Sequence, residues 1–270
     1  MLFDFIRLGQ PTNFMHRHRL AGTVTVDGQP ASRLICVFDR LTKVLLAAKW
    51  SDAATGAWEI AGMNEYPRRR LFVAAFDSEG NYNAEIADYV SQVVSPGQME
   101  YSSVYPPAYS SDYVKATSRY DTSSEPWFVT DPAKPLTGTN TSNCWLSAYA
   151  VLTNQKFNVD LGTAKVIRRL ILENFHTGGS GYDIGIKNFS IYGSNSSAAF
   201  LNVDYASLSD LTLLGEFTAR PHALIDQSDP QYFVFNNDTA YRYIILRIAD
   251  NQGGGTYMGL RHIELQTQDD

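Results

Sequence analysis

The sequence has few cysteines, no long apolar run and no stretch rich in helix-forming residues. Only two of its 270 residues are cysteines, Cys36 and Cys144, so a disulfide framework is not indicated and a buried free thiol is expected at each. No window approaches the length of a membrane span, which argues against membrane insertion. Because long runs of Ala, Leu, Glu and Lys are missing while Gly, Ser, Thr, Asn and Tyr are plentiful, we expect strands joined by turns.

The chain also lacks a signal peptide and an excess of basic charge. Its first residues, MLFDFIRLGQ, have no basic start, no sufficient apolar run and no small-residue cleavage site. We therefore expect a protein made in a reducing cytoplasm and not secreted through a signal peptide. The 22 Lys and Arg residues are outnumbered by 28 Asp and Glu residues, a net charge of −6. This balance argues against a nucleic-acid partner, because neutralising phosphates needs a basic face.

Motifs of catalysis and of metal binding are missing as well. The sequence contains no GxSxG, P-loop or HExxH motif, and its five histidines are scattered. The one HxH pair, His16 and His18, precedes the first predicted strand. Most Asp and Glu residues fall at expected turns and strand ends, where hydration explains them. The sequence therefore predicts no catalytic residues and no enzymatic activity.

What the chain does contain is two series of short alternating segments. We predict a first antiparallel β-sandwich over residues 1–95, with a tight turn at Asp27-Gly28. Its predicted strands are 19–27, 31–38, 42–49, 56–61, 70–77 and 82–90. Alternation within them places an inner face on Val24, Val26, Leu34, Cys36, Trp58, Phe72 and Ala74.

The pattern changes at residues 96–112, where Pro, Ser and Tyr dominate without a period. This segment is interpreted as a linker or as an extended strap that packs on a neighbour. A second all-β unit is predicted over residues 113–270. Its strands are 155–160, 166–174, 186–192, 211–217, 231–235, 241–249 and 259–266. Residues 241–249 are apolar on both faces in their middle, which predicts a central strand.

The second unit resembles the discoidin, or coagulation factor 5/8 C-terminal, superfamily of galactose-binding-like jelly rolls. The segments that carry the resemblance are NCWLSAYAVLTNQKFNVDLG (143–162), VIRRLILENF (166–175), FSIYGSNSSAAF (189–200), AYRYIILRI (240–248) and GLRHIELQ (259–266). The first unit is similar to transthyretin-like or carboxypeptidase-regulatory-like sandwiches, through residues 22–60 and 73–90. In this form it looks like the small modules of tailed-phage tail proteins. The expected fold class is therefore all-β, a small sandwich followed by a jelly roll.

The discoidin-like resemblance implies that ligands bind on loops at one end of the jelly roll. The glycine-rich loop His176–Gly185 would be such a loop, and it offers His176, Tyr182 and Asp183 for sugar hydroxyls and ring faces. Tyr149 and Tyr257 could join them from neighbouring loops. The alternative remains open that the glycines only form a hairpin and that the tyrosine packs on its own loop.

A structural calcium ion often accompanies this superfamily. The corresponding loop, Asp131–Asn143, is rich in oxygen ligands, and the resemblance implies Asp131, Asn140 and Glu264 as candidate calcium ligands. His262 occupies the place where the family usually has its glutamate, and Glu264 lies two residues further on the same face.

These features lead to three alternative hypotheses of function. The first is a non-enzymatic virion protein of a tailed phage, in the tail tip, baseplate or fibre, that attaches to a host-surface saccharide. Its expected partners are other virion tail proteins, and it is expected to be a homo-oligomer whose multivalency raises a weak affinity for sugar. The second is an assembly or decoration protein that binds no glycan. The third is a carbohydrate-binding accessory module of a bacterial enzyme system.

Overall fold

The chain divides into two compact units, Met1–Met99 and Glu100–Asp270. The structure, a computed structural model, describes residues 17–96, 98 and 100–268. The start of the predicted first unit, residues 1–16, lies outside the described residues. Within the described part, strands dominate both units, and the single α-helix is the five-residue α1 (Ser197–Leu201). No helix there is long and apolar enough to cross a membrane. The predicted all-β class is confirmed.

The first unit is an antiparallel sandwich of a three-stranded and a four-stranded sheet. The first sheet has the order β6 (Ala57–Met63), β1 (His18–Thr23) and β9 (Val93–Val94). The second has the order β5 (Leu45–Trp50), β4 (Leu34–Asp39), β7 (Leu71–Phe76) and β8 (Glu85–Val90). A small hairpin joins β2 (Thr25–Val26) to β3 (Gln29–Pro30). Its turn is the predicted Asp27-Gly28, and both residues have the positive φ, 50° and 78°, that such a two-residue turn requires.

The predicted inner face of β4 and β7 is wrong. The core is formed by Leu20, Ile35, Val37, Ile60, Met63, Leu71 and Val73. Leu34, Cys36, Phe72 and Ala74 therefore point away from the space between the sheets, and Phe72 stacks on Phe38 at 4.7 Å. Both faces of these two central strands are apolar, so alternation alone could not distinguish them.

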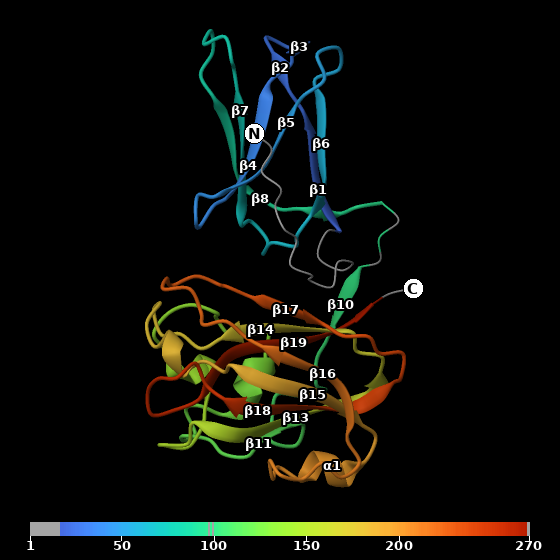
Figure 1. The fold of residues 1–270 in the computed structure, drawn as a ribbon, viewed down its shortest axis with the longest axis vertical. Helices are drawn as coiled ribbons and strands as arrows, with labels where there is room; N and C mark the ends of the chain where they lie inside the picture. Colours follow the sequence, from blue (N-terminus) through green and yellow to red (C-terminus); the bar gives the residue numbers. More distant parts are fainter. Residues whose placement is uncertain (1–16, 97, 99, 269–270) are drawn as a thin grey trace, which may run out of the picture. The chain divides into compact units, whose positions relative to one another are not determined.

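The second unit is a jelly-roll sandwich of two five-stranded antiparallel sheets. One sheet has β10 (Tyr101–Val104), β19 (Gly259–Gln268), β14 (Arg169–Asn174) and β17 (Gln231–Val234), with β12 (Trp145–Leu146) also on β19. The other has β11 (Val114–Ala116), β13 (Thr153–Lys165), β18 (Tyr241–Asp250), β15 (Asn188–Ser194) and β16 (Thr212–Thr218). Figure 1 shows the two layers stacked face to face.

Side chains from both layers form one core in the second unit. Trp145 and Phe157 are fully buried there with ring centroids 5.6 Å apart, and Trp145 Nε1 donates to the carbonyl of Ser118 at 2.9 Å. The predicted central strand is β18, which lies between β13 and β15. Both faces of β18 are apolar. On one face, Ile244, Leu246 and Ile248 enter the core. On the other face, Tyr243 and Ile245 form a second cluster with Phe200 of α1.

The segment 96–112 is not a free linker over its whole length. Residues 101–104 form β10, which pairs with residues 265–268 of β19. Tyr105 OH also donates to Glu264 Oε2 at 3.0 Å. The predicted start of the second unit at residue 113 is therefore too late, because the strap adds a strand to the edge of β19.

Strand register places several connections at the same end of this sandwich, which we call the loop end. Thr153 pairs with Asp250, Asn174 with Leu260, and Asn188 with Thr218. The loop end therefore contains the segments 117–125, 147–152, 175–187, 219–230 and 251–258.

We expect a fragment of residues 100–270 to fold by itself and a fragment of residues 113–270 to be less stable. The shorter fragment loses β10 and leaves Glu264 without Ser103 and Tyr105. Thermal unfolding followed by circular dichroism should show a midpoint lower by about 5 °C or more, equivalent to roughly 2 kcal/mol. Equal midpoints would show that residues 100–112 add no stability.

Candidate functional site

Three tyrosines from three loops meet at the loop end. The ring centroid of Tyr257 lies 5.0 Å from that of Tyr120 and 5.8 Å from that of Tyr149, both in edge-to-face geometry. Tyr149 is 67% exposed and Tyr120 is 48% exposed. Tyr257 is partly buried and packs on Cys144, Leu146, Phe175 and Ile184. We call Tyr120, Tyr149 and Tyr257 the tyrosine cluster.

Backbone hydrogen bonds hold the loops that carry these rings. The amide of Ala150 donates to the carbonyl of Thr256 at 2.8 Å, and the amide of Tyr120 donates to that of Leu146 at 2.8 Å. The amide of Ser147 donates to the carbonyl of Met258 at 2.8 Å, and the amide of Met258 donates to the side-chain Oγ of Ser147 at 2.9 Å. The exposed rings therefore stand on fixed backbone, which limits the entropy lost when a ligand contacts them.

Asp183 lies beside the loop that carries Tyr257. The amide of Gly254 donates to the carbonyl of Asp183 at 3.1 Å. A Cβ atom on Gly254 would lie only 1.9 Å from Asp183 Oδ2, so the carboxylate occupies the space that any other residue would fill. Gly255 has a positive φ of 70° and a Cβ there would meet Ile184 at 2.1 Å. The two glycines let the 181–185 and 251–257 segments interlock.

Of the five predicted ligand-binding residues, Tyr149 and Tyr257 are in ring contact, and Asp183 lies against Gly254, three residues before Tyr257. Tyr182 lies on the same loop and is 39% exposed, but it makes no ring contact within the described residues. Tyr120 was missed because it lies in a polar segment where no strand was predicted. Its only sequence signal is an aromatic residue among Ser, Arg and Asp (SRYD) in a polar loop.

The prediction that His176 points outward is wrong. Its side chain is fully buried and stacks on His222, with ring centroids 3.9 Å apart and planes 16° apart. His176 Nδ1 accepts from the amide of Gly179 at 3.2 Å, which leaves Nε2 to donate to the carbonyl of Leu136 at 2.8 Å. Burial and the neighbouring His222 lower the pKa of His176 to about 4. This neutral imidazole therefore holds the loop in place instead of facing a ligand.

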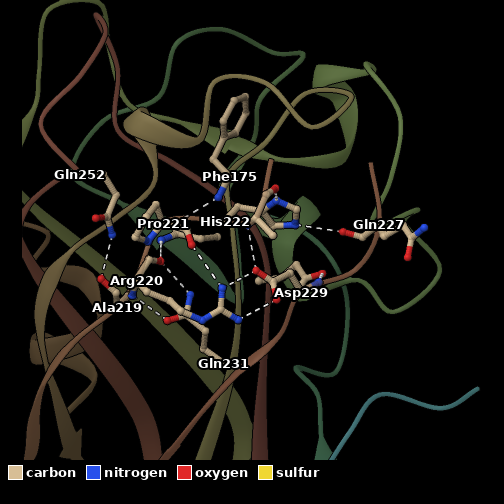
Figure 2. A network of polar contacts seen from close by, with 12 residues as sticks. Phe175, Ala219, Arg220, Pro221, His222, Gln227, Asp229, Gln231 and Gln252 are labelled. Carbon is tan, nitrogen blue, oxygen red and sulfur yellow. Dashed lines mark hydrogen bonds and ion pairs between the residues drawn. The ribbon is translucent and has the colours of Figure 1, made fainter. Parts of the chain in front are cut away.

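A partly buried polar network continues from His222 into the 219–231 segment (Figure 2). Arg220 and Asp229 form a two-point ion pair, in which Nη2 and Oδ1 are 2.7 Å apart. Asp229 Oδ2 also accepts from the amide of Ala223 at 2.9 Å. The side chain of Gln231 bridges the amide and the carbonyl of Arg220 at 2.7 and 2.9 Å. These contacts fix the segment that covers the buried side of the glycine-rich loop.

The loop Asp131–Asn143 does not fit the calcium ion implied by the resemblance, because a buried arginine uses its oxygens. Arg261, only 1% exposed, donates through Nη2 to the carbonyl of Gly138 at 2.9 Å and through Nη1 to that of Asn140 at 3.3 Å. Its Nη2 also donates to the carbonyl of His176. A guanidinium thus supplies the positive charge among these carbonyls.

The three predicted calcium ligands are each used locally. Asp131 Oδ1 accepts from the amide of Ala133 at 2.9 Å, and Asn140 Oδ1 from that of Ser142 at 2.9 Å. Glu264 accepts from Ser103 and Tyr105 on the β10 side and lies 3.6 Å from His262 Nε2. Burial opposes ionisation of Glu264, but these partners outweigh it and hold its pKa at about 2. The described residues include no group of three or more His, Cys, Asp or Glu side chains placed to hold a metal ion.

Comparisons with known proteins found solved structures with a limited likeness to this chain. No family model and no curated protein matches the chain. A solved chitosan-binding module from a chitosanase/glucanase of Paenibacillus sp. IK-5 is 19% identical, with a TM-score of 0.40 over 57% of this chain and 92% of that one. The family 32 carbohydrate-binding module of C. perfringens NanJ, solved with galactose, is 16% identical, with a TM-score of 0.40 over 57% and 92%.

A third similar structure is the lectin domain of lectinolysin, solved with Lewis B antigen. It is 15% identical, with a TM-score of 0.39 over 56% of this chain and 89% of that one. At these identities and TM-scores, no role and no ligand is carried from these modules to this chain.

We expect the thermal midpoint to be unchanged by a chelator or by added calcium, because Arg261 already bonds the loop carbonyls. Replacing Arg261→Gln leaves buried carbonyls without donors, which should cost about 3 kcal/mol. Differential scanning calorimetry with and without calcium measures both effects. Lys187→Gln, on an exposed residue, is the control and should change little. A calcium-dependent midpoint in the unmodified protein would contradict this assignment.

Glu173 should make the stability fall as pH rises towards 7. It is 1% exposed, and burial raises its pKa from 4.5 to about 7, although bonds from Ser228 and the Asp229 amide oppose the shift. The folded state therefore favours the protonated acid: this contribution is complete below pH 4.5 and is lost as pH passes 7. Ionisation of Glu173 should therefore lower the free energy of unfolding by about 3 kcal/mol between these pH values, and Glu173→Gln, which cannot ionise, should lack this decrease.

Urea unfolding of both proteins at pH 5 and pH 8 measures the effect of Glu173. The unmodified protein should lose stability relative to Glu173→Gln between these two pH values. Parallel changes in both proteins would show that Glu173 ionises normally in the fold.

Proposed function

We propose that the second unit binds a saccharide through the tyrosine cluster and Asp183. The observation that carries this proposal is the exposure of Tyr149, 67%, on a ring that is held edge-to-face against Tyr257. A large aromatic side chain exposed on fixed backbone is typical of a recognition surface. Its position on loops between strands, with a carboxylate nearby, supports binding at this end of the sandwich.

The chemistry of the cluster suits a hydroxyl-rich ring. The apolar face of a sugar packs on the face of a tyrosine, while hydroxyls need a few directed polar groups. The Tyr120 and Tyr149 phenols and the Asp183 carboxylate supply donors and acceptors of this kind. Burial and a hydrogen bond with Tyr120 raise the pKa of Tyr257, so its phenol stays neutral and able to donate near pH 7. A small open site of this type has millimolar affinity, about 4 kcal/mol.

Weak binding at one site requires several sites to act together. We propose this for either of two settings that share the same recognition step and involve no catalysis. In one, copies of the chain in a phage tail attach the virion to host-surface saccharides, with other tail proteins as partners. In the other, the chain is a carbohydrate-binding accessory of a bacterial enzyme system, which is the setting of the similar chitosan-binding module. Linked sites raise the apparent affinity in both.

Tyr149→Ala should reduce saccharide binding at least about tenfold, equivalent to 1.4 kcal/mol, without lowering the thermal midpoint. The side chain is mostly exposed, so its loss removes ligand contact area and little packing. A glycan array identifies the ligand, and titration of the full chain with that glycan measures the loss. Asp183→Asn should weaken binding while it preserves the shape of the loop.

Tyr109→Ala is the matched control, because Tyr109 is also an exposed tyrosine, at 40%, but lies outside the cluster between β10 and β11. It should bind as the unmodified protein does. If Tyr149→Ala binds glycan equally well, the cluster is not the site. If no glycan binds and the tyrosines are covered in an oligomer, the loop end serves assembly.

A further inference from the structure

A polar groove lies on the outer face of the sheet that contains β15, β16 and β18. It has a volume of about 440 Å³, and its lining includes Ser190, Tyr205, Glu216 and Arg247. Their strand neighbours Phe189, Ile191, Leu246 and Ile248 enter the core, so Ser190 and Arg247 point away from it. Nearby on this outer face, α1 covers Tyr192, Tyr243 and Ile245. The groove is therefore a part of the face that α1 leaves open.

Three polar residues that line the groove, Glu216, Ser190 and Arg247, lie in register in a row across the sheet. Ser190 pairs with Glu216 of β16 on one side and with Arg247 of β18 on the other. Arg247 in turn pairs with Lys156 of β13. Since neighbouring strands lie about 4.8 Å apart, the Cα atoms of Glu216 and Arg247 are about 10 Å apart. The row has an exposed carboxylate at one end and two adjacent cations at the other.

Arg247 is held by uncharged groups. Its Nε donates to the carbonyl of Tyr205 at 3.0 Å and its Nη1 to the phenol of Tyr192 at 3.3 Å. The guanidinium carbon lies 4.2 Å from the centroid of the Tyr205 ring. These contacts orient the guanidinium, but none of them neutralises its charge.

Lys156 adds a second positive charge beside Arg247. It is only 1% exposed, and its ammonium makes one long hydrogen bond, 3.5 Å, to the carbonyl of Ser207. Burial and the charge of Arg247 lower the pKa of Lys156, while Asp204 opposes this shift. Within the described residues no carboxylate forms an ion pair with either cation. An anion placed in the groove at Arg247 would supply the missing charge.

We propose that this groove binds an acidic saccharide, with a uronate carboxylate on Arg247, a sugar ring against Tyr205, and hydroxyls on Ser190 and Glu216. An acidic peptide or another polyanion fits less well, because Glu216 would repel a second negative charge about 10 Å from the first. Glu216 can instead accept hydrogen bonds from sugar hydroxyls. The inference does not depend on the tyrosine cluster, which lies on the loops and not on the sheet face.

The test is calorimetric titration of the full chain with a neutral oligosaccharide that carries a single uronate residue, and with the same oligomer after its carboxylate has been reduced to an alcohol. Arg247→Gln should weaken binding of the acidic oligomer at least about tenfold, the value of a hydrogen bond to a charged group. Arg247→Lys should bind the acidic oligomer with an affinity between those of the unmodified chain and Arg247→Gln, because lysine keeps the charge but lacks the planar guanidinium. In the Tyr149→Ala chain, which lacks the exposed ring of the tyrosine cluster, Arg247→Gln should cause the same loss of acidic-oligomer binding.

Arg242→Gln is the matched control, since Arg242 lies on the same strand but outside the groove, and pairs with Asp160 at 2.8 Å. It should leave binding unchanged. Should Arg247→Gln fail to fold, Ser190→Tyr fills the groove from the solvent side of the sheet and should abolish binding. Equal binding of the acidic and reduced oligomers, full binding by Arg247→Gln or Ser190→Tyr, or tighter binding of oligoglutamate would each overturn the proposal.

Discussion

The loop end of the second unit depends on one buried cation, the guanidinium of Arg261. It bonds the carbonyls of Gly138 and Asn140 and that of His176, which belong to two segments far apart in the sequence. These carbonyls satisfy the Nη1 and Nη2 donors of Arg261, which would be costly to bury without a partner. Burial lowers the pKa of Arg261, but the charge persists at any physiological pH. The loops therefore keep their geometry through a covalently attached cation, which cannot dissociate.

Around this cation, polar side chains buried at the loop end support the loops, and exposed ones are left for ligands. The His176–His222 stack lies inside, and the buried Asp229 is paired with the half-exposed Arg220. His176, His222 and Asp229 satisfy backbone groups that no strand pairs with. Tyr149 and Tyr120 remain outside, on loops that this interior holds still. The groove at Arg247 differs from the loop end, because Ser190 and Arg247 lie on paired strands and the strand register fixes their positions. Rigid positions of either kind reduce the entropic cost of binding.

Local patterns predicted much of the fold. The alternating segments predicted most strands to within a few residues, and the Asp27-Gly28 turn and the central position of β18 are confirmed. The errors have one physical origin. Both faces of β4 and β7 are apolar, so their local sequence does not show which face packs in the core. Residues 101–104 have no hydrophobic period, so their local sequence does not show that they pair with β19. Packing partners decide both cases.

For the candidate site, the sequence by itself determined which residue types stand on the loops: tyrosines, glycines, an aspartate and a histidine. It determined the sharp turns as well, because only glycine accommodates the close approach at Gly254. Tertiary structure alone decided which of these side chains face water. Tyr149 and His176 are both polar-edged rings on predicted loops, yet one is 67% exposed and the other fully buried. The reason is that His222, Leu136 and Arg261, which lie far from His176 in the sequence, contact the His176 segment in the fold. The local sequence around His176 does not predict these contacts.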